Sequence, residues 1–68
     1  MTYSLIGVNG NALSIVCYVK NAMRKEGFSR IDIEKYQEKA LSRGYNDLLQ
    51  VSLDVLDMCN GIALKSSL

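Results

Sequence analysis

The residues best suited to hold a small ligand lie in a glycine- and asparagine-rich turn near the start of the chain. Residues 7–11 read Gly-Val-Asn-Gly-Asn and precede a helical pattern. Glycine lets a ligand approach the backbone closely, and the free N–H groups at a helix start attract anions. Asn9, Gly10 and Asn11 are therefore candidate backbone contacts. A tight turn with an asparagine helix cap explains the same residues, and the spacing matches neither nucleotide-binding glycine motif.

A basic cluster follows at the end of the first predicted helix. Lys20, Arg24 and Lys25 lie there, with Arg30 just beyond, and we take Lys20 and Arg24 as candidate contacts for an anionic ligand. The alternatives are a solvated face or ion pairing with the third predicted helix, which has no basic residue. The acids on that helix are Asp47, Asp54 and Asp57.

Tyrosine supplies the candidate stacking surface, because its ring is apolar and its hydroxyl is a hydrogen-bonding group. Four tyrosines are present: Tyr3, Tyr18, Tyr36 and Tyr45. Tyr45 follows a glycine turn and is the most site-like. Tyr36 is expected at the edge of the core.

Catalytic and metal-binding patterns are absent from the sequence. There is no histidine, and no serine or cysteine stands in a recognisable nucleophile motif. Glu34 and Glu38 lie four apart but are flanked by lysines, as on a solvated face. Cys17 and Cys59 without histidine cannot form a closed zinc site in one chain. We therefore expect a protein that is not an enzyme, with no cofactor and no bound metal.

The composition indicates one small domain that buries part of its apolar surface against a partner. The chain has 68 residues, 49% of them hydrophobic, which is more apolar surface than so short a chain buries well. A homo-oligomer is the simplest expectation. The net charge of +1 argues against nucleic-acid binding. No signal peptide or membrane-length apolar run is visible, so we expect a cytoplasmic protein without a membrane partner.

The first third of the chain predicts an extended segment and a helix. Residues 1–10 are expected to form an arm lying on the helices, or a strand pairing with a second copy. A helix should begin after Asn9 or Asn11 and run to about Glu26, with Gly27 as its left-handed terminator. Its apolar face has helical spacing. The residues of that face are Ala12, Ile15, Val16, Val19, Ala22 and Met23.

The second predicted helix has the clearest start signal. Ser29 is the expected N-cap, Asp32 stands at the third helical position, and Phe28 and Ile33 suit a hydrophobic staple. The helix should run to about Ser42 and be closed by Gly44. It is the most polar of the three, with a narrow inward stripe. That stripe consists of Ile33, Tyr36, Gln37 and Ala40.

The third predicted helix is capped by Asn46 and ends at residues 60–61, with residues 62–68 as a frayed tail. It is apolar over most of its circumference, which favours burial on several sides. Cys17 and Cys59 are expected to be buried free thiols. The fold class is thus mainly α: a short N-terminal extended segment and a compact three-helix domain over residues 1–68, in an oligomer.

Residues 7–12 and residues 44–49 together resemble a family of small proteins from bacteria, phages and prophages, for which no activity is established. The family pattern is G-x-D-G-N-A near the start and G-D-Y-x-H-L-L later. This chain has Asn9 for the acid, Arg43-Gly44 before Tyr45, and Asp47 for the histidine. The resemblance implies a phage-type context, in which small proteins often block host defences by binding something.

Three functions follow from these observations. The first is a homo-oligomer that sequesters a small anionic, nucleotide-like signalling ligand and so counters host defence, with two copies forming the pocket. Its candidate contacts are Asn9, Gly10, Asn11, Lys20, Arg24 and Tyr45. The second is an inhibitor or adaptor that docks its third helix or basic face on a host protein. The third is a helix-turn-helix regulator, disfavoured because no helix is rich in Arg, Asn or Gln.

Overall fold

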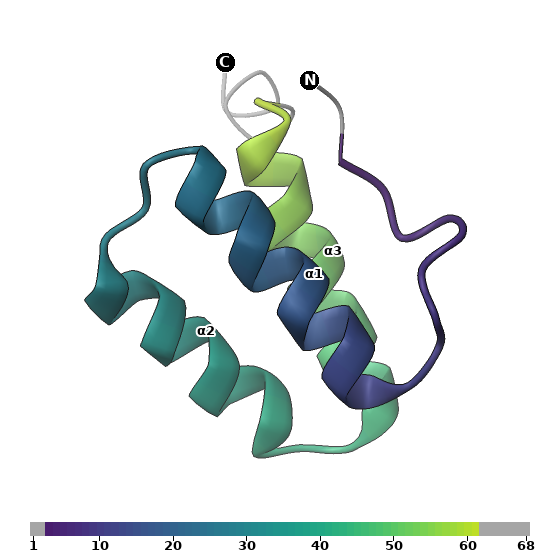
Figure 1. Ribbon diagram of the computed structural model, residues 1–68. Helices are drawn as coiled ribbons and strands as arrows, with labels where there is room; N and C mark the ends of the chain where they lie inside the picture. Colours follow the sequence, from purple (N-terminus) through teal and green to yellow (C-terminus); the bar gives the residue numbers. More distant parts are fainter. Residues whose placement is uncertain (1–2, 62–68) are drawn as a thin grey trace.

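The computed structural model describes residues 3–61, which form three α-helices joined by short loops (Figure 1). The helices are α1, Ala12–Lys25; α2, Arg30–Leu41; and α3, Tyr45–Cys59. Each helix contacts both of the others, so the three enclose one core. The predicted compact three-helix fold is confirmed. The predicted tail, residues 62–68, lies outside the described residues.

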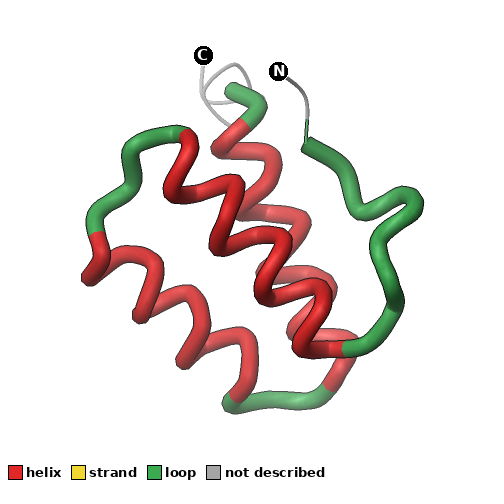
Figure 2. The backbone as a smooth tube through the Cα atoms, viewed as in Figure 1, coloured by secondary structure: helices red, strands yellow, loops and turns green. Residues whose placement is uncertain are grey.

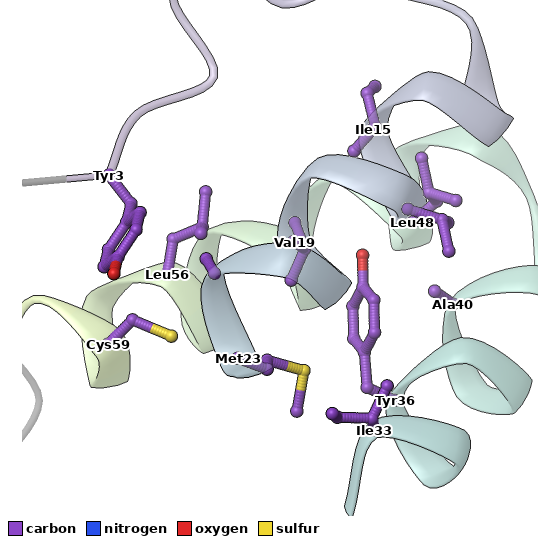
Figure 3. Packing of buried hydrophobic residues seen from close by; sticks show 12 residues of the cluster. Tyr3, Ile15, Val19, Met23, Ile33, Tyr36, Ala40, Leu48, Leu56 and Cys59 are labelled. Carbon is purple, nitrogen blue, oxygen red and sulfur yellow. The ribbon is translucent and has the colours of Figure 1, made fainter. Parts of the chain in front are cut away.

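The core is built from the apolar faces of all three helices. On α1 the five residues from Ile15 to Met23 that were predicted to face inward are buried, and Ala12 is half-buried. Val19 of α1 is fully buried and belongs, with Leu48 of α3, to the buried cluster in Figure 3. Removing these side chains from water is the main stabilising term for so small a fold.

Tyr36 is a core residue and lies deeper than the sequence indicated. Its side chain points from α2 into the space between α1 and α3, among Ile15, Val19 and Leu48 (Figure 3), and only 4% of its surface is exposed. A phenol at that depth needs a hydrogen-bonding partner. Ser52 of α3, which has no exposed surface, supplies it at 2.6 Å.

The α1–α2 connection has the geometry that the sequence predicted. Gly27 adopts the left-handed conformation, with φ of 84°. Phe28 N–H donates to the Met23 carbonyl and Gly27 N–H to the Arg24 carbonyl, which is the Schellman pattern. The Ser29 hydroxyl then accepts from Asp32 N–H and caps α2. The chain therefore reverses direction within four residues.

The start of α3 was predicted incorrectly. Gly44, and not Asn46, is the N-cap, and Tyr45 is already helical. Gly44 has φ of −69° and so does not end α2 in a left-handed conformation; α2 ends at Leu41 with Ser42 as its cap. The earlier start places Tyr45 at the first helical position. From there its hydroxyl donates to the Gly10 carbonyl, which is a long-range contact.

The N-terminal segment is an arm, as the sequence favoured; within residues 3–61 there is no strand (Figure 2). Side chains from the helices hold its backbone. The Asn60 carboxamide accepts from Tyr3 N–H at 2.7 Å and donates to the Tyr3 carbonyl at 2.9 Å. The Tyr18 hydroxyl accepts from Ser4 N–H at 3.0 Å. The arm is thereby fixed to both α1 and α3.

One burial prediction was wrong. Cys17 is exposed on α1, whereas Cys59 is buried as expected, and both are free thiols. On α3 the fully buried stripe is narrow, and Leu53 and Met58 are about half exposed. Within one chain α1 and α2 cover only one side of α3, so Leu53 and Met58 on its other side are exposed. No helix in the described part of the chain is long and apolar enough to cross a membrane.

Candidate functional site

A groove of about 570 Å³ lies between α1 and α2, and we call it the basic groove. Three cationic side chains and one carboxylate line the groove, so the net charge of the lining is +2. Apolar and amide side chains complete it. The lining residues are Lys20 and Arg24 of α1, Phe28 of the connecting loop, and Arg30, Ile33, Glu34 and Gln37 of α2.

The tight connection between the two helices assembles the closed end of the groove. Arg24 stands in the last turn of α1 and Arg30 is the first residue of α2. The left-handed Gly27 reverses the chain between them, so that two arginines six residues apart line the same hollow. Phe28, just before the Ser29 cap, is half-buried and lines the same groove. Local chain geometry therefore creates a basic site with an aromatic ring.

Each cation of the groove has a different partner. Lys20 donates across the groove to the Gln37 amide oxygen at 2.8 Å. Arg24 donates to Asn21 on its own helix at 3.0 Å, which uses one of its five N–H donors. Arg30 lies 3.5 Å from Glu34, and this is the only ion pair within residues 3–61. Most donors of both guanidinium groups are therefore free to bind an anion.

The other predicted contacts gather at a separate corner. The Asn9 side chain accepts from Asn11 N–H, and the Asn11 side chain accepts from Leu13 N–H and caps α1. Tyr45, with 47% of its surface exposed, donates its hydroxyl to the Gly10 carbonyl. These bonds hold the arm, α1 and α3 together. The Oδ1 atoms of Asn9 and Asn11 and the Tyr45 hydroxyl are thus already engaged in the fold.

The six predicted contacts therefore form two groups within one chain. Asn11 and Arg24 lie at opposite ends of α1, which places them about 20 Å apart at 1.5 Å per residue. Asn9, Gly10, Asn11 and Tyr45 belong to the corner, whereas Lys20 and Arg24 belong to the basic groove. No single small ligand can contact both groups in one copy.

Five groove residues were missing from the predicted contacts: Phe28, Arg30, Ile33, Glu34 and Gln37. Arg30 was noted as an extension of the basic cluster, and Phe28 only as part of the staple. The capping signals at Gly27 and Ser29 could have identified them, because they imply a tight helical hairpin with α2 antiparallel to α1. Gln37 then falls opposite Lys20.

The acids of α3 do not neutralise the basic cluster within this chain. Asp47, Asp54 and Asp57 form no ion pair inside the described range. No three side chains among His, Cys, Asp and Glu converge there as a metal site would require. The lining of the basic groove offers charge, amide hydrogen bonds and a ring, which suits the binding of an anion.

Two groups near the arm have altered acidity. The hydrogen bond to Glu26, followed by burial, raises the pKa of Tyr3 to about 12. Burial, followed by the Glu26 charge, raises the pKa of the Cys59 thiol. Both groups therefore hold their protons more firmly than usual, and this favours a structural role for them.

Comparison with known proteins leaves the geometry as the basis for a functional conclusion. No family model, curated protein or solved structure matches the chain.

Proposed function

We propose that this protein is a non-enzymatic binding protein whose basic groove takes a small anionic, nucleotide-like ligand. One observation supports this most directly: Arg24 and Arg30 line a hollow of about 570 Å³ together with the Phe28 ring. Guanidinium groups bind phosphate with paired, charge-assisted hydrogen bonds. An aromatic side chain beside them offers a surface on which a base can stack.

The dimensions of the groove suit a ligand of nucleotide size. Drug-sized ligands occupy pockets of roughly 300–1,000 Å³, and the basic groove falls within that range. Lys20, held by Gln37 at 2.8 Å, adds a fixed positive charge toward the middle of the groove. Arg24 and Arg30 at the closed end would hold the phosphate, and the Phe28 ring would contact the base.

The proposal includes self-association, in which a second copy completes the enclosure of the ligand. Large apolar side chains are exposed on the arm and on every helix. They are Ile6, Leu13, Ile31, Leu41, Leu53 and Met58. Exposed apolar area of this kind favours burial against another copy. In a phage-type context such an oligomer would act as a sponge that removes a nucleotide-like immune signal.

A charge-reversal pair tests the groove. Calorimetric titration with AMP, which has one phosphate and one base, should show binding by the wild type. Arg24→Glu should lose at least about tenfold in affinity, because charge-assisted hydrogen bonds are lost and repulsion is added. Arg43→Glu is the matched control, since Arg43 is an exposed loop arginine outside the groove. Equal affinity of both variants for AMP would reject the groove as the site.

A second candidate is a protein–protein inhibitor or adaptor, which the arm favours. Leu5 to Val8 form a turn with Gly7 at φ of 85°, and Val8 N–H donates to the Leu5 carbonyl. At its tip Ile6 has 93% of its surface exposed, and a rigid apolar tip of this kind suits a protein pocket. Capture of one host protein at fixed stoichiometry, lost in Ile6→Asp, would support this function.

A further inference from the structure

The lining of the basic groove contains one acidic side chain, Glu34, whose negative charge repels an anionic ligand. Glu34 follows Arg30 by one helical turn, and its carboxylate lies 3.5 Å from the Arg30 Nε. Both residues line the groove. A carboxylate at the Nε of the guanidinium competes for the edge of Arg30 at which a phosphate oxygen could also bind. It also repels a ligand of like charge.

We propose that Glu34 is a built-in counter-anion that competes with the ligand for Arg30 and lowers the affinity of the groove. This inference rests on the proposed function, because it names the regulation of that same site. The competing ligand group is a phosphate monoester, whose oxygens match the two-point geometry of a guanidinium. When the phosphate binds Arg30, the Glu34 carboxylate moves into solvent.

The exposure of the pair makes this exchange easy. The side chains of Arg30 and Glu34 are 91% and 63% exposed. Exposed ion pairs of this kind are weak, because solvent screens both charges. Burial does not lock Glu34 in place, and its helix leaves it free to rotate outward. The pair therefore orients Arg30 when the groove is empty and gives way to a stronger anion.

The test compares two substitutions that remove the same charge from the same helix. Glu34→Gln should bind AMP about two- to fivefold more tightly than the wild type, as expected for loss of a weak exposed pair. Glu38→Gln is the control, because Glu38 is exposed on α2 but does not line the groove. Equal affinities of these two variants for AMP would overturn the proposal.

A double-mutant cycle separates competition from a general charge effect. If Glu34 acts through Arg30, the gain in AMP affinity should shrink toward the Glu38→Gln level when Arg30→Gln is also present. A gain of the same size without Arg30 would contradict the competition. Thermal melting of each variant checks that folding is retained.

Two further ligands separate this inference from the proposed function. The affinity for inorganic phosphate should also rise in Glu34→Gln. The affinity for adenosine, which has no phosphate group, should stay the same. Measurable AMP binding without a gain in Glu34→Gln overturns the role of Glu34 alone. If neither the wild type nor Glu34→Gln binds AMP or phosphate, the proposed function fails as well.

Discussion

Tyr36 and Ser52 face one another across the α2–α3 interface, with 2.6 Å between the phenol oxygen and the hydroxyl oxygen. This is the buried side-chain hydrogen bond that joins the two helices. Tyr36 lies on the same helix as four residues of the basic groove. The bond thus fixes α2 against the core and, through α2, fixes one wall of the groove.

Ser52→Ala should lower the free energy of unfolding by about 1–3 kcal/mol, because the buried phenol loses its partner. Tyr36→Phe should cost a similar amount, since it leaves the Ser52 hydroxyl unpaired. The double variant should cost less than the two single costs added together. Urea denaturation measures all three. Strict additivity would show that the bond does not contribute to stability.

Asn60→Ala should release the arm from α3, because the carboxamide makes both hydrogen bonds to the Tyr3 backbone. We expect a loss of about 1–2 kcal/mol in the free energy of unfolding. Amide hydrogen exchange of residues 3–8 should accelerate, while that of α2 stays unchanged. Unaltered exchange in the arm would show that the carboxamide does not hold it.

Alkaline pH should weaken the fold through Tyr3. Its pKa is about 12 when folded, against the ordinary 10 of an unfolded chain. Below pH 10 both states keep the proton and the contribution is complete. Between pH 10 and 12 the unfolded state releases the proton first, so stability falls. Ultraviolet titration should show one late phenolate fewer in Tyr3→Phe than in the wild type, where burial also raises the pKa of Tyr36. An identical curve would contradict this.

The two cysteines should differ in reactivity. Cys17 is exposed on α1, while Cys59 is 8% exposed and burial raises its pKa. A chromogenic disulfide reagent should label Cys17 at least about tenfold faster, because the thiolate is the reacting species. Cys17→Ser should leave only the slow phase, and urea should make that phase fast. Equal rates in the native protein would contradict the described burial.

Local signals in the sequence predicted the helical hairpin well. Gly27 and Ser29 identify the end of α1 and the start of α2, because a left-handed terminator and a side-chain cap depend on neighbouring residues alone. The apolar spacing from Ile15 to Met23 likewise placed the core face of α1 correctly. These features need no knowledge of the tertiary fold.

Features that depend on distant residues were missed. Asn46 has the better local propensity for a cap, but α3 begins at Tyr45, whose hydroxyl contacts the Gly10 carbonyl 35 residues away. Cys17 was a different kind of error, because the helical spacing already left it outside the predicted apolar face of α1. The groove combined two predicted cations with Phe28 and Gln37, which only the antiparallel pairing of α1 and α2 brings together.

The proposal that the basic groove binds a nucleotide-like anion is tested most directly by native mass spectrometry. The wild-type protein would be measured as purified from cells and again after incubation with AMP. We expect an oligomer that gains a nucleotide mass, and Arg24→Glu should lose that mass while Arg43→Glu keeps it. A wild-type protein with no nucleotide mass in either sample would contradict the account.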